Sequence, residues 1–453
     1  MKNHALIGLL SCSLFAVACG ATSDDPAPVT APAATDPTPA EAPPAEPVAP
    51  PLDHGAPSDT YPAFTPAMGQ LKHSGGSVLT NPVIVTVTWP GNDTADQLET
   101  FGDTVGAGQY WKDVTSEYAV SAAISGAAHH VRLTDPAPAT LSDTELAAFV
   151  NANVAKTEGG WPKPSADVVY ILYLPKTTTL TLQGKSACAQ GVGGYHDSTK
   201  VNGVSTAYAI VPHCGYSDFD HITVAASHEL GEAVTDPYPR SRPAWSGFRD
   251  EDLAWEFFQQ FQSENGDACE FYRDSDLAAG ESDVAFTVQR QWSNASAKAG
   301  HDPCVPVFKG AKYFNVTPLA LEDIDVDLSS LGGDIATSKG IKVKVGEPRQ
   351  IPLGFYSDGA LGPWTIKAVS GGIAGGRSSG GVDLELDVTE GQNGQKAYLT
   401  ITVNTAGKTD SELITIVSTR AGISHYMPLL LPPRLAIPPA TALIVQELTG
   451  PSL

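Results

Sequence analysis

The stretch from Val168 to Leu174 reads VVYILYL and is the most apolar run of the chain after its N-terminal segment. A short run of β-branched, leucine and aromatic residues predicts a strand in the middle of a sheet. Upstream, Val83–Trp89 (VIVTVTW) alternates apolar residues with threonine and predicts a second strand, which ends at Pro90-Gly91. Tyr208–Val211 predicts a short third strand, so we expect a sheet to organise this region.

Helices are expected between these strands. Apolar residues at helical spacing predict one helix over Thr94–Thr104 and a second, shorter one over Leu146–Val154. Because strand and helix patterns are mixed along residues 67–305, we expect a mixed α/β domain over that range.

The pattern changes after residue 305. Runs typical of strands follow one another without a helical pattern between them, at Ile341–Val345, Leu384–Val388, Leu399–Val403 and Leu413–Val417. Asn393-Gly394, between the second and third of these runs, predicts a hairpin turn. We therefore expect residues 306–453 to form an all-β sandwich of immunoglobulin-like type.

Residues 1–18 have the pattern of a bacterial signal peptide. Lys2 supplies a positive start, Ala5–Val17 is a nearly unbroken apolar run, and small residues lead to Cys19. Such a segment is too short, and wrongly flanked, for a membrane-spanning helix. We expect it to be removed and the protein to be exported.

Two kinds of processing fit these residues. Ala16-Val17-Ala18 is an A-x-A site for ordinary signal peptidase, which would release a soluble protein, and it also resembles a lipobox that ends in Cys19. Leu9-Leu10-Ser11-Cys12 is a second lipobox candidate, but the apolar stretch before it is very short. We expect a lipid on Cys19 that anchors the protein in the cell envelope, at the outer membrane or the cell surface.

The segment after Cys19 is expected to be a tether. Residues 19–66 are rich in proline, alanine, threonine and acidic residues, a composition that buries little apolar surface and favours an extended chain. The whole chain has a formal charge of −23, from 50 acidic and 27 basic residues. Because phosphate binding needs clustered lysine and arginine, this charge argues against nucleic acid as a partner and leaves the lipid as the only membrane contact.

Four cysteines lie beyond Cys12 and Cys19, namely Cys188, Cys214, Cys269 and Cys304. In an oxidising compartment four cysteines suggest two disulfides, for which three pairings are possible. We expect the sequential pairing, Cys188–Cys214 and Cys269–Cys304. The spacings do not fit a zinc finger or ribbon.

The segment Asp220–Pro237, DHITVAASHELGEAVTDP, is the strongest candidate for a chemical site. Asp220 can cap a helix and the final proline can stop it, which predicts a helix over His221–Thr235. On this helix His228 and Glu232 lie four residues apart, on one face, and both side chains can reach one ion.

The motif is a variant of a known metal-binding pattern. Glu229 follows His228 directly, as the general base does in HExxH metallopeptidases, but Glu232 makes the motif HExxE. We expect one divalent metal ion; imidazole suits zinc best, and a carboxylate in place of the second imidazole also admits calcium or manganese. A core helix in which the histidine is hydrogen-bonded to Glu232 would give the same pattern.

The sequence leaves the identity of the third metal ligand open. Asp236 is the local candidate, one turn further along, and Glu264 and Asp267 are alternatives from a later segment. His196 and His213 lie near the first expected disulfide and could line a cleft, although such histidines are more often plain loop residues.

A family resemblance is carried by several separated motifs. SHELGEAVTDP, at Ser227–Pro237, resembles the SHELAEAVTDP-type signature of EXORDIUM-like, phosphate-induced proteins and their bacterial relatives. Further elements resemble that family in the same order, at Val83–Gly91, Cys188–Cys214, Glu264–Cys269 and Val288–Asn294. The resemblance covers about residues 78–305 and implies a secreted, zincin-like domain, with the tether and the β domain outside it.

These patterns predict a surface-anchored, metal-dependent hydrolase that acts on peptides or proteins, with Glu229 as the proton-transfer group. The alternative is a non-catalytic extracellular signalling or adhesion protein that uses the same site for a structural ion. Adhesion or glycan binding through the β domain is a third hypothesis. The sequence contains no phosphate-binding loop or dinucleotide fingerprint.

Overall fold

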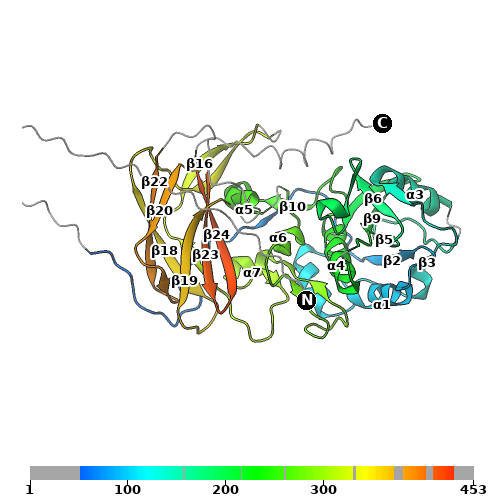
Figure 1. The fold of residues 1–453 in the computed structure, drawn as a ribbon, viewed down its shortest axis with the longest axis horizontal. Helices are drawn as coiled ribbons and strands as arrows, with labels where there is room; N and C mark the ends of the chain where they lie inside the picture. Colours follow the sequence, from blue (N-terminus) through cyan, green and yellow to red (C-terminus); the bar gives the residue numbers. More distant parts are fainter. Residues whose placement is uncertain are drawn as a thin grey trace, which may run out of the picture. The chain divides into compact units, whose positions relative to one another are not determined.

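The computed structural model describes residues 51–156, 159–215, 217–259, 262–329, 333–371, 381–404 and 412–432 (Figure 1). The chain from Asp53 onward forms one compact unit. The predicted signal peptide, Cys19 and most of the predicted tether lie outside the described residues. Among the helices that are described, none has the length and apolarity needed to cross a membrane.

A five-stranded sheet organises the first half of this unit. Its strands, in spatial order, are β3 (His130–Arg132), β2 (Val83–Thr88), β5 (Val168–Tyr173), β9 (Val204–Val211) and β8 (Tyr195–Val201). The first four run parallel, and the edge strand β8 runs antiparallel to β9. Every residue of β5 is buried, so the VVYILYL run is the central strand, as predicted.

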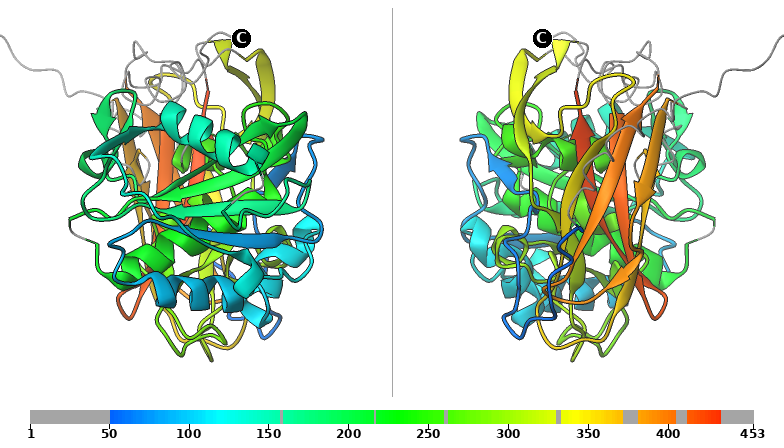
Figure 2. Two further views of the ribbon diagram at one scale, coloured as in Figure 1. Left: turned by 90° about the vertical axis from the view of Figure 1, so that its right-hand side faces the viewer. Right: turned by 90° about the vertical axis from the view of Figure 1, so that its left-hand side faces the viewer.

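Helices cover both faces of this sheet (Figure 2). On one face lie α1 (Ala95–Val105), α2 (Gln109–Thr115) and α4 (Phe219–Thr235), and on the other lies α3 (Asp143–Lys156). Val169 and Ile171 pack with the first three helices, whereas Tyr170 and Leu172 pack with α3. Successive side chains of a strand point to opposite faces, and both faces of a parallel sheet must be covered, which explains the continuous apolar run.

Helix α4 begins two residues before the predicted start. Its N-cap is Asp218 and not Asp220, because Asp218 Oδ1 accepts the backbone N–H of His221 at 3.0 Å. Asp220 lies in the first turn, where a negative charge interacts favourably with the helix dipole. The helix ends at Thr235, as predicted from Pro237.

Two antiparallel sheets make up the second half. One contains β15 (Phe314–Pro318), β18 (Arg349–Ser357), β22 (Lys396–Val403) and β20 (Val382–Leu386). The other contains β21 (Glu390–Gly391), β19 (Trp364–Ser370), β23 (Glu412–Arg420) and β24 (Ile423–Leu431). Figure 2 shows strands of both sheets in the second half of the chain. Both sheets contribute to one apolar core, for example with Leu399 from the first and Ile416 from the second. The described part of this region is therefore β-rich, as predicted.

One predicted strand in this region is wrong. Ile341–Val345 is not a strand, because the strand of this segment is β17 (Ile335–Gly340), which pairs with β16 (Glu322–Asp327). Beyond Gly340 the chain leaves that ladder, and the N–H of Ile341 donates to Leu430 O instead.

The predicted hairpin turn at Asn393-Gly394 is also more complex than a two-residue loop. β20 and β22 do pair antiparallel, but β21 lies between them in sequence and joins the other sheet. Asn393 Nδ2 donates to Ser58 O at 2.6 Å and to Thr60 O at 2.9 Å. Residues 53–66 thus lie against the β region, and a free tether would end near residue 52.

The remaining elements are short. The strands are β1 (Leu71–His73), β4 (Thr140–Ser142), β6 (Thr179–Leu182), β7 (Lys185–Ser186), β10 (Trp245–Phe248), β11 (Asp276–Leu277), β12 (Val288–Gln289), β13 (Gln291–Trp292) and β14 (Cys304–Val305). The α-helices are α5 (Leu253–Phe258), α6 (Asp267–Glu270) and α7 (Asn294–Ala299), and the 3-10 turns are η1 (Ser116–Tyr118), η2 (Ala127–His129), η3 (Cys188–Gln190) and η4 (Asp250–Asp252). Helix α5 packs against the β region, since Trp255 and Phe258 share a core with Leu429.

Both predicted disulfides are present. Cys188 and Cys214 are bonded, with Cα atoms 5.4 Å apart, and Cys269 and Cys304 are bonded, with Cα atoms 5.8 Å apart. Disulfides persist in oxidising compartments. The two bonds therefore indicate an extracytoplasmic protein.

Candidate metal centre

Helix α4 carries the three motif residues into the interior. His228, Glu229 and Glu232 are 9%, 5% and 4% exposed. The helix packs closely against another segment of the protein because Gly231 has no side chain. A Cβ atom at this position would lie 2.1 Å from Gln291 Oε1, which is too close for a larger residue. Gly231 thus lets the Gln291 side chain of β13 pack directly on the helix, where its Nε2 donates to Ser227 O at 2.8 Å.

A first group of side chains that could hold a metal ion forms between α4 and α6, which lie side by side (Figure 1). His228 Nε2 is 3.1 Å from Glu232 Oε1 and 3.6 Å from Asp267 Oδ1. The backbone N–H of Asp267 donates to Glu232 Oε1 at 3.0 Å. The Cys269–Cys304 disulfide holds α6 at this position. The ligand atoms of these three residues all lie within 4.8 Å of one another.

A second group shares Glu232 and adds His196 and Glu264. His196 is the second residue of the edge strand β8, which contacts α4. Its Nδ1 is 3.4 Å from Glu232 Oε2, and its Nε2 is 3.4 Å from Glu264 Oε2. Glu232 therefore presents one carboxylate oxygen to each imidazole.

Glu229 lies beside both groups without being a member of either. Its Oε2 is 3.5 Å from His196 Nδ1. The backbone at Gly194 lies close to the Glu229 side chain, and a Cβ atom on Gly194 would be 2.7 Å from Glu229 Oε1. Burial raises the pKa of Glu229, although His196 and His228 oppose this. A carboxylate with a raised pKa next to the ligands is placed to accept and return a proton.

Asp236 does not join either group, although the sequence offered it as a ligand. Its Oδ1 accepts the backbone N–H of Ala244 at 2.7 Å, and its carbonyl oxygen lies 3.1 Å from His196 Nε2. Because α4 ends at Thr235, the Asp236 side chain has left the helix face that carries the motif. Asp236 positions the His196 ring through its backbone.

The cluster contains a large excess of acidic groups over imidazoles. The carboxyl groups belong to Glu229, Glu232, Asp236, Glu264 and Asp267, and the imidazoles to His196 and His228. In the described part of the chain, no lysine or arginine forms an ion pair with these carboxyl groups. Burial of an unpaired charge costs several kcal/mol, so this excess requires protons or a cation.

The pKa shifts of these side chains reflect the same excess of carboxyl groups over imidazoles. Burial raises the pKa of Glu264 well above its usual value and that of Asp267 to about 8. Burial acts in the same sense on Glu232, but His228 and His196 outweigh it and hold its pKa low. Burial also disfavours both imidazolium forms, yet the surrounding carboxylates raise the pKa of each ring. A bound cation would relieve this repulsion.

Two buried carboxylate oxygens of the cluster, Glu264 Oε2 and Asp236 Oδ2, are left without a donor in the described part of the chain. Glu264 Oε2 has no hydrogen-bond partner among the described residues, and its ion-pair contact is His196 Nε2 at 3.4 Å. Glu264 is 8% exposed. Buried polar atoms are almost always partnered, so an unpartnered oxygen of this kind is available to a cation or a proton. Imidazole nitrogens with carboxylate oxygens are a donor set that binds divalent ions, and the residues therefore fit a metal.

Gln289 sets the orientation of the His228 ring. Gln289 Nε2 donates to Gly266 O at 2.7 Å, which turns its Oε1 toward His228 Nδ1 at 2.8 Å. The ring therefore carries a proton on Nδ1 and directs Nε2 toward Glu232. A hydrogen bond to the second nitrogen is the usual support of a metal-binding histidine.

Replacement of Gln289 by alanine should weaken metal binding by about 10–100-fold, because the His228 ring would lose its fixed tautomer and orientation. The dissociation constant would be measured by titration of the chelated protein with zinc. Gln350→Ala, at an exposed position of β18, is the matched control and should leave the constant unchanged. An unaltered constant in Gln289→Ala would show that His228 does not hold the ion.

A third group of acidic residues and histidine has its own counter-charge. Asp274, Asp302 and His425 lie together, but Arg290 is bonded to both aspartates. The guanidinium supplies the positive charge that the cluster around Glu232 lacks. We therefore assign no metal to this third group.

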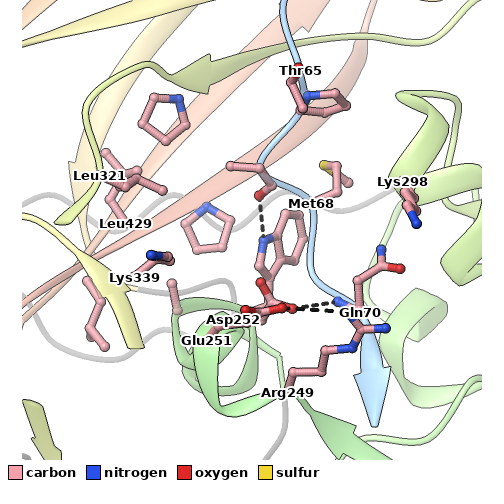
Figure 3. Close-up of a pocket in the computed structure, with 17 residues that line it drawn as sticks. Thr65, Met68, Gln70, Arg249, Glu251, Asp252, Lys298, Leu321, Lys339 and Leu429 are labelled. Atoms are coloured by element: carbon pink, nitrogen blue, oxygen red, sulfur yellow. Dashed lines mark hydrogen bonds and ion pairs between the residues drawn. The ribbon is translucent and has the colours of Figure 1, made fainter. Parts of the chain in front are cut away.

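A cavity of ≈ 310 Å³ lies among the segment before β1, α5 and β24 (Figure 3). Met68 and Leu429 contribute apolar side chains to its wall, and Asp252 Oδ2 accepts the backbone N–H of Gln70 at 3.1 Å. None of the residues around Glu232 lines this cavity. Without an imidazole or a converging set of ligands it offers no evident chemistry, and the candidate site is the buried cluster.

The structure thus assembles most of the residues predicted for the site and adds one that the sequence left aside. His228, Glu229, Glu232 and Glu264 converge, and Asp267 joins them. His196 is an unexpected member, and His213 lies apart, with Nδ1 3.1 Å from Cys214 O. The sequence signal for His196 was its place near the first expected disulfide, but nothing local showed that it lies on a strand that borders α4.

Comparisons with known proteins add little to this geometry. No family model matches the chain, and no curated protein matches it. Among solved structures, a Bacteroides ovatus GH5 xyloglucanase in complex with a XXXG heptasaccharide is 12% identical, with a TM-score of 0.14. That match covers 26% of this chain and 20% of the xyloglucanase chain, so the chain spans about a fifth of that structure.

Proposed function

We propose that this protein is an extracytoplasmic, metal-dependent hydrolase of the peptidase type, with its site on α4. The observation that carries the proposal is the buried cluster in which two imidazoles and several carboxylates converge and for which the described residues provide no lysine or arginine partner. A metal ion is the partner that such a donor set accommodates.

The residues have distinct roles in this proposal. His228, Glu232 and Asp267 hold the ion, with Glu264 as a further carboxylate ligand close by. When bound, the ion would polarise a carbonyl group and make water more acidic. Glu229 accepts the proton of the attacking water and returns it to the leaving amine. Zinc suits the imidazoles, and the predominance of carboxylates also admits calcium or manganese.

The proposed setting follows from the termini and the two halves of the fold. A lipid on Cys19 and a tether to about residue 52 would hold the protein at the outer membrane or cell surface. The first half would be a zincin-like domain of the EXORDIUM-like type, supported by the long buried helix beside an antiparallel edge strand. The second half would be an immunoglobulin-like sandwich, supported by two antiparallel sheets with a shared core.

The burial of the site favours a structural role for the ion as the alternative to catalysis. The ligand side chains are only 5–19% exposed, so a substrate has limited access to them. An ion held in this way can serve stability instead of catalysis. The second candidate is therefore a non-catalytic surface protein for signalling or adhesion, with a structural ion at the same residues.

Removal of the metal tests both candidates. Elemental analysis of the purified protein should find a divalent metal, and chelation should lower the melting temperature, because binding at 100-fold over the dissociation constant stabilises by about 2.7 kcal/mol. Cleavage of casein should be lost with the metal and return on its re-addition. Bound metal without cleavage would select the structural role, and a protein that binds no metal would exclude both.

A further inference from the structure

We infer that the cluster binds two divalent ions, bridged by the carboxylate of Glu232. This inference rests on the proposed function, in that it assumes a metal at this site. The outer ion belongs to His228, Glu232 and Asp267, and the inner ion to His196, Glu232 and Glu264.

The first support is the division of the ligands. The two imidazoles belong to separate groups, and Glu232 is the residue that the groups share. Glu232 Oε1 faces His228 Nε2 at 3.1 Å, and Glu232 Oε2 faces His196 Nδ1 at 3.4 Å. A carboxylate with one oxygen toward each ligand set has the arrangement of a bridge between two ions.

The second support is the spacing of the ligand atoms. Bonds of about 2.1 Å to a tetrahedral ion place neighbouring ligand atoms about 3.4 Å apart. In the outer group His228 Nε2 is 3.1 and 3.6 Å from its two oxygens, a spacing that suits one ion. In the inner group His196 Nδ1 is 3.4 Å from Glu232 Oε2 and His196 Nε2 is 3.4 Å from Glu264 Oε2, and one ligand atom from each of the three residues lies within 4.8 Å of the others.

The third support is charge. If the five carboxyl groups of the cluster are ionised and both imidazoles are neutral, the cluster carries five negative charges. One divalent ion would leave three of these charges uncompensated, and two ions would leave one. The unpartnered Glu264 Oε2 lies in the inner group, away from His228 and Asp267. A single ion in the outer group would leave this oxygen without a partner, whereas an inner ion satisfies it.

Solvent access differs between the two positions. In the outer group the side chains of Asp267 and His228 are 19% and 11% exposed, and in the inner group those of Glu264 and His196 are 10% and 5% exposed. We therefore expect the outer ion to exchange with solvent faster and to be removed first by a chelator.

Metal stoichiometry tests the inference on the full chain. The protein would be stripped of metal, loaded with Mn²⁺, dialysed, and measured by elemental analysis and electron paramagnetic resonance. Wild type should retain two ions per chain with a spin-coupled signal. His196→Ala and Asp267→Asn should each retain one ion with the signal of an isolated Mn²⁺. His221→Ala, an exposed histidine of the same helix whose side chain is 61% exposed, should behave as wild type.

Several outcomes would overturn the inference. One ion in wild type, or unchanged stoichiometry in His196→Ala, would refute the inner site. Circular dichroism would verify folding of each variant, and Glu264→Gln replaces His196→Ala if the latter does not fold. One ion with chelator-sensitive cleavage would refute the two-ion centre alone, whereas two ions without cleavage would refute the hydrolase alone.

Discussion

Glu229→Gln should reduce kcat/KM for peptide hydrolysis by about 10²–10⁴-fold while the protein keeps its metal. The substitution preserves the size of the side chain but removes its ability to accept a proton. Glu229 belongs to neither ligand group, so the ions should stay bound. Its contacts are the 3.5 Å approach to His196 and the close passage of Gly194, and an amide fits in the same space. The measurement is steady-state cleavage of a peptide substrate, paired with elemental analysis.

The control for this experiment removes a carboxylate charge elsewhere. Glu347→Gln changes a side chain that is 66% exposed and should leave both cleavage and metal content unaltered. Full activity in Glu229→Gln would exclude Glu229 as the proton acceptor. Loss of the metal together with activity would assign Glu229 to the ligands instead.

Arg290→Ala should destabilise the fold by about 3–5 kcal/mol, because it leaves the buried carboxylate of Asp302 and the half-buried carboxylate of Asp274 without their counter-charge. Arg290 is 1% exposed. Its NH1 is 3.0 Å from Asp274 Oδ2, and NH2 bonds Asp302 and the carbonyl of Cys304. The guanidinium also lies 5.0 Å from the ring of Phe308. The substitution therefore removes ion pairs, hydrogen bonds and packing at one point.

Urea denaturation followed by tryptophan fluorescence would measure the loss of stability. Arg249→Ala is the matched control, because Arg249 is 51% exposed and its 3.5 Å ion pair with Glu251 lies at the surface. Equal stability of the two variants would mean that the buried pairs around Arg290 contribute no more than a surface pair.

Local sequence patterns were sufficient for the main elements. The apolar run from Val168 has no polar face because it lies between helices on both sides, and its composition alone places it at the centre of the sheet. The helix that carries His228 and Glu232 follows from capping and spacing, and its end at Thr235 follows from the proline. Its start was misjudged because two aspartates compete for the cap.

Patterns were less reliable where partners are distant in sequence. The strand expected at Ile341–Val345 has the right composition, yet the pairing of β17 with β16 stops at Gly340. Residues 53–66 have the composition of a tether, yet they bond to Asn393 and Lys396. In both cases contacts with a remote segment, and not local propensity, decide the conformation.

The sequence by itself determined the α4 motif, the central strands of the first sheet and the four cysteines, because each is a property of neighbouring residues. Only the tertiary structure decided which side chains make up the full candidate site. His196 reaches Glu232 because β8 lies at the sheet edge beside α4, and Asp267 reaches it because α6 is held there by the Cys269–Cys304 bond. A ligand set assembled from three segments depends on distances through space, and no spacing along the chain encodes those distances.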